Sequence, residues 1–352
     1  MKHIILPLLK SEISVRCTET GSLRRPDQQR LVFFLAMEEW LAKHEDEAFF
    51  IWQSAPTVIC GRNQIAEAEI NLKWCREHGI EWYRRKSGGG CVYSDSGNLM
   101  LSYITATENA AEAFTRYLDK LVDVLNSLGV PAERSGRNDI LVDGRKVSGN
   151  SFYSVAGTGK SIVHGTLLYD TDFDNMTNSI TPSETKLSGH AVESVRQRVT
   201  LLKDYLHDMT VPELKTYIVD SFCDSSRTLS EDDVQEIKSI EQGYLEDSFR
   251  YGHNPSFSLN REMKNIASNE RKLAGAGIIN VNLNIKRGVI ASIRVSGDYF
   301  EVKPGFEEEL DRRLEDCLYE TNAIQERLED FPAEDYVYGL TAKDLIGLLI
   351  DC

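Results

Sequence analysis

The chain has 352 residues, of which 41% are hydrophobic and 27% are charged, a composition typical of a globular protein large enough for two domains. Its net charge of −15 argues against nonspecific nucleic-acid binding, which depends on Lys and Arg neutralising phosphates. No apolar stretch is long enough to span a bilayer, and the first residues resemble neither a signal peptide nor a transit peptide. We therefore expect a cytoplasmic protein without membrane or nucleic-acid partners.

The first hundred residues alternate helical and strand-like patterns. Apolar residues at helical spacing predict a helix over 26–43, and a second helix over 66–78 is closed by Gly79. Short runs rich in β-branched and aromatic residues predict strands. These strands cover 48–54, 57–60, 80–83, 91–94 and 99–105.

The middle of the chain predicts a long helix followed by antiparallel strands. An apolar stripe runs along 109–128, and Gly129 stands where such a helix stops. The turn Asp143-Gly144 joins strands over 139–142 and 145–154, and another strand covers 161–169. This order of elements favours a mixed, mostly antiparallel sheet with packed helices, an α+β fold.

The last part of the chain predicts a smaller unit. After a helical, acidic stretch over 210–247, strands are expected over 278–285, 288–296 and 299–302, followed by helices from 307. We therefore divide the chain into a domain over 1–247 and a small α+β domain over 248–352.

Ser87-Gly88-Gly89-Gly90 lies between two predicted strands. Ordering three consecutive glycines costs backbone entropy, which a fixed role must offset. Such a run lets the backbone pass close to a ligand and point N–H groups at it. Arg85 beside it is suited to hold a phosphate or a carboxylate.

Lys146 follows the hairpin turn and is flanked by small residues. A mobile ammonium group can bridge a carboxylate and an α-phosphate as charge builds between them. On the paired strand, Asp139 could hold Mg²⁺ and Asn138 could read a base edge. A histidine such as His164, taken alone, is more often a core residue than a catalytic base. Together these residues indicate a site that holds a small carboxylic acid against a nucleotide.

Residues 157–161 mimic the end of a phosphate-binding P-loop. The first glycine of that motif is replaced by Ser154, and a strand rather than a helix follows. The segment therefore predicts a hairpin turn in which Lys160 is solvated.

These blocks resemble the lipoate–protein ligase family, and the resemblance covers nearly the whole chain. The segments that carry it are Glu38-Glu39, Trp52, Pro56–Ile59, Gly61–Gln64, Glu69, Asn71, Arg84–Gly90, Gly136–Asp139, Lys146, His164–Leu168, Ser194–Val199, Asn254–Phe257 and Gly297–Phe300. The sequence departs from the family pattern at Phe34-Leu35-Ala36 and at Ile65–Ala68, which concerns the lining of the pocket rather than the reaction.

The resemblance implies a two-step reaction with MgATP. Lipoate, or octanoate, is first converted to an acyl-adenylate and pyrophosphate. The acyl group then passes to a lysine of an acceptor domain, as in 2-oxoacid dehydrogenases or the glycine-cleavage H protein. It also implies a core like that of biotin protein ligase and class II aminoacyl-tRNA synthetases, with a C-terminal accessory domain.

The family's functional residues map onto this chain by motif. Lys146 would be catalytic and would touch both lipoate and phosphate, and Asp139 would meet a metal such as Mg²⁺ or a phosphate. The residues implied to contact ATP are Arg85, Gly90, Cys91, Val92, Tyr93, Asn138, Asp139 and Lys146. Those implied to contact the lipoyl group are Arg85, Ser87, Gly88, Gly89, Lys146, Ser148, Gly149, His164 and Gly165.

Three alternatives share part of this pattern. An octanoyl or lipoyl transferase of the same fold uses a cysteine nucleophile, but no cysteine lies between Cys91 and Cys223. A biotin ligase would carry a different glycine-arginine loop. A non-catalytic scaffold that binds acyl-acceptor domains is disfavoured by the presence of Arg85, Asp139 and Lys146.

Overall fold

The computed structural model describes residues 1–6, 29–107, 109–136, 138–180, 197–252 and 266–352. These residues form two compact units. The larger unit contains Met1–Cys60, Glu67–Arg85 and Cys91–Arg250, and the smaller contains Gly61–Ala66, Lys86–Gly90 and Tyr251–Cys352. Segments of the sequence analysis that lie outside the described residues are 26–28, Arg137, 194–196 and 254–257.

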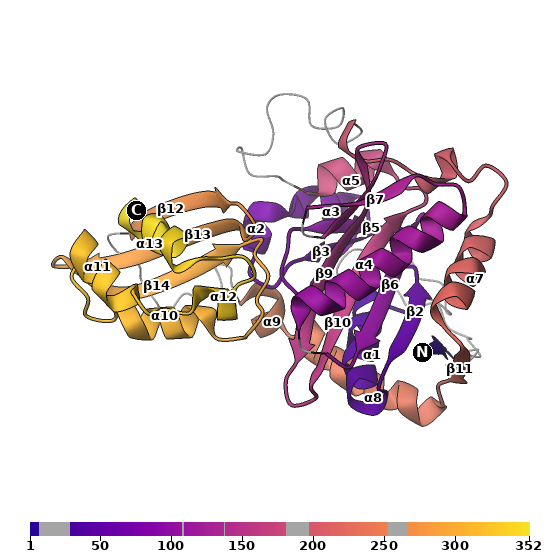
Figure 1. Cartoon of the computed structure of the whole chain (residues 1–352), viewed down its shortest axis with the longest axis horizontal. Helices are drawn as coiled ribbons and strands as arrows, with labels where there is room; N and C mark the ends of the chain where they lie inside the picture. Colours follow the sequence, from indigo (N-terminus) through magenta and orange to yellow (C-terminus); the bar gives the residue numbers. More distant parts are fainter. Residues whose placement is uncertain (7–28, 108, 137, 181–196, 253–265) are drawn as a thin grey trace. The chain divides into compact units, whose positions relative to one another are not determined.

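The larger unit is built on an eight-stranded sheet (Figure 1). Its strands are β1 (Lys2–Ile5), β2 (Ala48–Trp52), β6 (Asn98–Thr105), β7 (Ala132–Ser135), β8 (Asp139–Val142), β9 (Arg145–Val155), β10 (Lys160–Leu168) and β11 (Ser225–Thr228). They lie in the order β11-β1-β2-β6-β10-β9-β8-β7. Only β1 pairs in parallel with its neighbours, and all other pairs are antiparallel. The predicted α+β class is confirmed.

A second, three-stranded sheet completes the strands of the larger unit. β3 (Thr57–Cys60) is central, parallel to β4 (Glu81–Arg84) and antiparallel to β5 (Val92–Ser94). The turn that starts at Asp95 carries the chain from β5 to β6, so the strands on either side of it belong to different sheets.

Different helices cover the two faces of the large sheet. On one face lies α1 (Leu31–His44), whose Phe34 stacks on Trp52 with 4.6 Å between ring centroids. On the other lie α4 (Ala110–Ser127) and α7 (Val211–Phe222), where Phe222 stacks on Phe49. α8 (Glu231–Leu245) packs against α1. The short helices are α2 (Ala66–Glu69), α3 (Leu72–Glu77), α5 (Phe173–Ser179), a 3-10 turn at Leu202–Asp204 and α9 (Asp247–Tyr251).

The helix predicted over 109–128 is confirmed as α4. The side chain of Asn109 caps it by accepting the backbone N–H of Glu112 at 3.1 Å. Its apolar stripe is buried, as expected for a helix lying on a sheet; the fully buried members include Phe114, Tyr117, Leu118, Leu121 and Leu125.

The single helix predicted over 66–78 is wrong, because the chain is broken at Ile70 and Asn71. Ile70 forms a bridge with Ile180, and the Asn71 side chain accepts the N–H of Trp74 at 3.1 Å. An asparagine in this role begins a new helix, and so α2 and α3 are separate.

The continuous helical stretch predicted over 210–247 is also wrong. The polar residues of β11 interrupt it and pair in parallel with β1. Each helix beside this strand has its own start signal, a capping box of Thr210 with Glu213 for α7 and of Ser230 with Asp233 for α8.

The smaller unit has a meander of three antiparallel strands, β12 (Ile266–Leu273), β13 (Gly277–Lys286) and β14 (Val289–Gly297). Four helices share its core: α10 (Phe306–Leu314), α11 (Thr321–Leu328), α12 (Ala333–Tyr336) and α13 (Ala342–Ile350). The strand predicted over 299–302 is wrong, since only Glu301 makes a bridge there, with Val337. The edge strand β12 was missed because its residues are largely polar and do not alternate.

Two further expectations concern the surface. Lys160 is not a solvated turn residue, because it begins β10, its side chain is 15% exposed and its ammonium donates to the Glu45 carbonyl.

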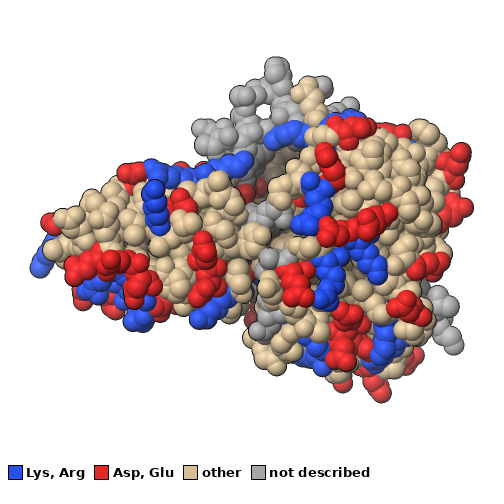
Figure 2. All heavy atoms as spheres, viewed as in Figure 1, with Lys and Arg blue, Asp and Glu red and all other residues tan. Residues whose placement is uncertain are grey.

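Among the described residues, no helix is both long and apolar enough to cross a membrane. On the face of the larger unit in Figure 2, Lys and Arg lie interspersed with Asp and Glu, so positive charge is available locally despite the net charge of −15.

Candidate active site

One face of the large sheet carries several of the residues singled out from the sequence. Directly opposed residues of antiparallel strands share a face, as do residues two apart along a strand. One row across the sheet is Phe50, Ser102, His164 and Ser151. The next row is Trp52, Met100, Thr166, Gly149 and Asp139. His164 and Asp139 therefore face the same side, the one covered by α1.

A β-bulge brings Lys146 to this face as well. Leu141 pairs with Lys146, whereas Ile140 pairs with Ser148, which leaves one extra residue on β9. Without that extra residue, Lys146 and Gly149 would project from opposite faces. With it, the Lys146 side chain lies across Gly149 and its Nζ reaches Oδ1 of Asp139 at 2.8 Å.

The absence of a side chain at Gly149 is what leaves room for this lysine. A Cβ at position 149 would stand 2.6 Å from both Cε and Nζ of Lys146. A glycine is therefore required at position 149 because the Lys146 side chain passes there, and not because the backbone has an unusual conformation.

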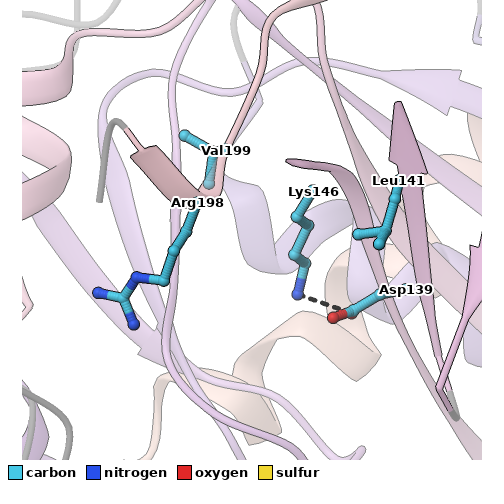
Figure 3. A pocket seen from close by; sticks show the side chains of 5 residues that line it. All are labelled: Asp139, Leu141, Lys146, Arg198 and Val199. Atoms are coloured by element: carbon cyan, nitrogen blue, oxygen red, sulfur yellow. Dashed lines mark ion pairs between the residues drawn. The ribbon is translucent and has the colours of Figure 1, made fainter. Parts of the chain in front are cut away.

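Lys146 and Asp139 line an open cavity of about 370 Å³, together with Leu141, Arg198 and Val199 (Figure 3). This is within the size range of small-ligand pockets. The side chains of Lys146 and Asp139 are 39% and 34% exposed, so both can meet a ligand. Figure 3 shows the two pointing toward one another, with the Arg198 guanidinium on the other side of Lys146.

Arg198 had no predicted role, although its segment belongs to the family resemblance. Val199 forms a parallel bridge with Lys146, and the Thr200 N–H donates to the Lys146 carbonyl at 2.9 Å. This backbone pairing places a second cation beside the lysine. No local pattern in the sequence predicts it, because the pairing joins residues more than fifty positions apart.

A buried polar network lies on the same face around Glu38 of α1, which is fully buried. Its carboxylate is 2.9 Å from Nδ1 of His164 and accepts the Ser102 hydroxyl at 2.6 Å. The Trp52 indole N–H in turn donates to the Ser102 hydroxyl at 3.0 Å. These partners are what allows a carboxylate to be buried. His164 is therefore a buried histidine whose ring orientation is fixed by Glu38.

The sequence of α1 carries one signal of this network. Glu38 occupies a position in the apolar stripe of α1, between Leu35 and Leu41. A charged residue at a core position requires a buried partner, but the sequence does not say which one.

Asn138, Ser148 and Gly165 are joined through a single side chain, that of Asn150. The amide of Asn150 donates to the Asn138 carbonyl at 2.9 Å and to the Ser148 hydroxyl at 3.1 Å. The Asn138 amide donates to the Asn150 carbonyl at 2.6 Å. A Cβ at Gly165 would stand 1.9 Å from Oδ1 of Asn150. The Asn150 side chain thus ties β9 to the residue that precedes β8, and it fills the space that Gly165 leaves on β10.

The glycine block Ser87–Gly90 belongs to the smaller unit. The Gly89 N–H donates to the Tyr299 carbonyl at 3.3 Å, and Gly89 has a φ of 87°, which favours glycine. A Cβ at Gly88 would stand 2.0 Å from the same carbonyl oxygen, whereas one at Gly90 would meet open space. The close backbone approach expected here is thus made, at Gly88, to another segment of the chain.

The residues on either side of the glycine block adjoin β4 and β5 of the larger unit. Arg85 is 5% exposed and donates from Nη1 to the Ile59 carbonyl at 3.2 Å. After the block, Cys91 and Val92 are partly exposed, and Tyr93 is buried. Burial also raises the pKa of Tyr93.

A metal ion such as Mg²⁺ was expected at Asp139. Within the described ranges, no group of three or more His, Cys, Asp or Glu side chains is arranged to hold a metal. Mg²⁺ beside a nucleotide, however, is held by one or two carboxylates together with phosphate oxygens. The one partly exposed carboxylate of Asp139 at the cavity fits that mode of binding.

Comparison with known proteins assigns the chain to a family. The profile described as "Lipoyl protein ligase A/B catalytic domain" matches residues 32–223, and that described as "Bacterial lipoate protein ligase C-terminus" matches residues 263–349. The chain belongs to the lipoate–protein ligase family. Lipoate-protein ligase LplJ of Bacillus subtilis is 33% identical over 90% of this chain and 95% of its own length. Lipoate--protein ligase 1 of Staphylococcus aureus is 32% identical over the same shares.

Solved structures share the fold. The P. falciparum LipL1 structure in complex with lipoate has a TM-score of 0.71, at 18% identity, and the match covers 92% of this chain and 96% of that one. Lipoate-protein ligase A bound with ATP has a TM-score of 0.55, at 22% identity, over 63% and 94%. A bipartite Thermoplasma acidophilum ligase, studied with its E2 lipoyl domain, has a TM-score of 0.57, at 22% identity, over 63% and 92%.

Proposed function

We propose that this member of the family is an ATP-dependent lipoate–protein ligase. In the first step, a carboxylate oxygen of lipoate bonds to the α-phosphorus of ATP, and pyrophosphate leaves. In the second step, the amine of an acceptor lysine bonds to the acyl carbon, and AMP leaves as the amide forms. The observation that carries the proposal is the cavity that Lys146, Asp139 and Arg198 line together.

Lys146 is the group that we assign to the first step. Negative charge accumulates where the carboxylate approaches the phosphate, and an ammonium placed between them stabilises that arrangement. Asp139 holds the ammonium in place at 2.8 Å, and Arg198 adds a second cation for a phosphate or pyrophosphate. Most of the remaining rate enhancement would come from positioning the two substrates.

We assign the acyl chain to the face of the sheet that α1 covers. His164, oriented by Glu38, would contact the lipoyl group from there. Lys146 takes the space at Gly149 and Asn150 the space at Gly165. Gly149, Gly165, Ser87, Gly88, Gly89 and Ser148 therefore remain lipoyl contacts on the family resemblance alone. An apolar pocket discriminates poorly between acyl tails, so octanoate remains an alternative substrate.

The nucleotide side of the proposal rests on the family resemblance and on a relative solved with ATP. Arg85, Gly90, Cys91, Val92, Tyr93 and Asn138 are the proposed contacts besides Lys146 and Asp139. The Asn138 amide already donates to the Asn150 carbonyl, so a contact with adenine would use its other N–H or its oxygen. When bound, Mg²⁺ would neutralise phosphate charge, with Asp139 as its protein ligand.

The acceptors are proposed to be lipoyl domains of 2-oxoacid dehydrogenases or the glycine-cleavage H protein. A relative studied with its E2 lipoyl domain supports this class of partner. Residues 1–247 would form the catalytic domain and residues 248–352 an accessory domain. The cytoplasmic location stays a prediction from the sequence.

The deciding experiment combines the purified full chain with lipoate, MgATP and an unmodified lipoyl domain. Intact mass spectrometry of the acceptor should show a gain of one lipoyl group that requires ATP. The gain should be absent for Lys146→Ala. Transfer from an acylated carrier protein without ATP would instead indicate a transferase, and the absence of both reactions would support a scaffold.

A further inference from the structure

Cys60 is the last residue of β3, and Cys91 directly precedes β5, the antiparallel neighbour of β3. Ile59 pairs with Val92 in the antiparallel register of β3 and β5, and continuing that register sets Cys60 opposite Cys91. Opposed residues of antiparallel strands project from the same face, with Cα atoms about 4.5–5.5 Å apart. That separation lies within the range that a disulfide bond spans.

The two thiols interact in the reduced protein, where both are free. The Cys91 thiol donates a hydrogen bond to the Cys60 sulfur, which, together with burial, raises the pKa of Cys91. Burial alone would raise the pKa of Cys60, but the hydrogen bond from Cys91 and the nearby Arg84 and Arg85 outweigh burial and lower it.

The two cysteines differ in access to solvent. Cys60 is fully buried at the end of the central strand, with Arg84 as its register partner on β4. Cys91 is partly exposed and directly follows the glycine block. An external oxidant therefore meets Cys91 first, and Cys60 is placed to react next. A partly exposed thiol beside a second thiol that can resolve the mixed disulfide is an arrangement found in redox-sensitive pairs.

We propose that Cys60 and Cys91 form a reversible intramolecular disulfide by exchange with a low-molecular-weight disulfide, and that this bond inactivates the enzyme. The first part rests on the sheet register alone. The second part rests on the proposed function, in which residues 90–93 contact ATP. A bond from Cys91 to β3 would fix the end of the glycine block where it must adapt to the nucleotide.

The exchange proceeds in two balanced steps. The Cys91 sulfur bonds to one sulfur of the external disulfide, its proton goes to solvent, and the thiolate that leaves is protonated by solvent. The Cys60 sulfur then bonds to Cys91, its proton goes to solvent, and the second thiolate leaves and is protonated. Two protein thiols are oxidised, and one external disulfide is reduced to two thiols.

The test uses the full-length, reduced protein and oxidised glutathione as the probe. After incubation, free thiols are alkylated, and a non-reducing digest is analysed by mass spectrometry. We expect a peptide pair linked through Cys60 and Cys91 that disappears on treatment with dithiothreitol. A stable glutathione adduct on Cys91 in the wild type, or its pairing with another cysteine, would overturn the proposal.

Two variants sharpen the measurement. In Cys60→Ser the mixed disulfide on Cys91 cannot be resolved, so a glutathione adduct should accumulate there. Cys75→Ser removes another buried cysteine and should leave the Cys60–Cys91 linkage unchanged. Since the wild-type linkage is read by mass, it does not depend on whether either variant folds well.

Activity is measured separately, as ATP-dependent acyl transfer before oxidation, after oxidation and after reduction. We expect at least a ten-fold loss on oxidation and recovery on reduction. If the linkage forms in a chain that never shows ligase activity, the proposed function fails and the disulfide stands. If an active ligase forms no linkage, or keeps its activity with the linkage formed, the inference fails and the function stands.

Discussion

Nζ of Lys146 lies 2.8 Å from Oδ1 of Asp139, across a β-bulge that turns both side chains to the same face of the sheet. Both groups are more than a third exposed, and ion pairs of this kind contribute little to stability, about 0–1 kcal/mol. The pair therefore positions the ammonium at the cavity, and its loss should affect chemistry far more than folding.

Replacing Lys146 by Ala should lower lipoate-dependent ATP–pyrophosphate exchange by about a hundred-fold or more, since a charge-stabilising group is removed from the reacting atoms. The melting temperature should stay close to that of the wild type. Lys203→Ala is the matched control, because Lys203 is also half exposed and pairs with Asp170 at 2.6 Å. Near-normal exchange in the Lys146 variant would remove this residue from the mechanism.

Gly149→Ala should impair the same exchange reaction without unfolding the protein. The new Cβ would clash with the flexible end of Lys146, so the lysine moves away and the backbone keeps its conformation. We expect at least a ten-fold loss of exchange with little change in melting temperature. Gly243→Ala, where a Cβ meets nothing within 4 Å, should leave exchange unchanged. Full activity of Gly149→Ala would contradict the close packing of Gly149 and Lys146.

Glu38 and His164 should prove energetically coupled. Glu38→Ala leaves the His164 ring and the Ser102 hydroxyl buried without their carboxylate partner, which costs about 2–4 kcal/mol of unfolding free energy. A double-mutant cycle with His164→Ala, followed by urea denaturation, should show an interaction of about 1 kcal/mol or more. If the two single substitutions changed the unfolding free energy additively, Glu38 and His164 would not be energetically coupled. The lipoate KM of each variant reports whether the pair also serves binding.

Glu45 should make the stability of the larger unit depend on pH. Burial acts to raise its pKa, but hydrogen bonds from Lys2 and Arg227 outweigh burial and lower it. Because the folded-state pKa is below the unfolded one, the stabilisation is fully present above the unfolded pKa, near 4.5. It is lost as the pH falls through the folded pKa.

Glu45→Gln should therefore reduce the unfolding free energy at pH 7 by about 1 kcal/mol, and the difference from the wild type should shrink toward pH 3. Glu47→Gln, which alters an exposed pair with Arg116, serves as the control and should show little difference at either pH. A difference for Glu45→Gln that stays constant over this range would contradict the assignment.

Local chemistry explains which elements could be predicted from the sequence. α4 has a capping Asn109, a complete apolar stripe and a following glycine, and the hairpin of β8 and β9 has Asp143-Gly144, both with positive φ. β11 has no such signal, because its polar residues become a strand only by pairing with β1. β11 forms because of tertiary pairing with a distant strand, and the sequence around Ser225–Thr228 alone does not predict a strand.

The candidate site divides in the same way. Lys146 and Asp139 lie on one hairpin, so their proximity follows from a short stretch of sequence. The contact of Glu38 with His164, and the presence of Arg198 and Lys146 at one cavity, depend on how distant segments are laid on the sheet. No sequence pattern predicts the β-bulge in β9, yet this bulge determines the face of the sheet from which the Lys146 side chain projects.

The position of β1 in the sheet has a consequence for how the chain acquires its fold. β1 ends at Ile5, but one of its two neighbours, β11, begins only at Ser225, and the Met1 ammonium pairs with Asp224. At about 5–20 residues per second, synthesis leaves one side of β1 unpaired for on the order of ten seconds or longer. β1 is thus made before β11 but is completed only after it, and a nascent chain that ends before Ser225 leaves one edge of β1 open.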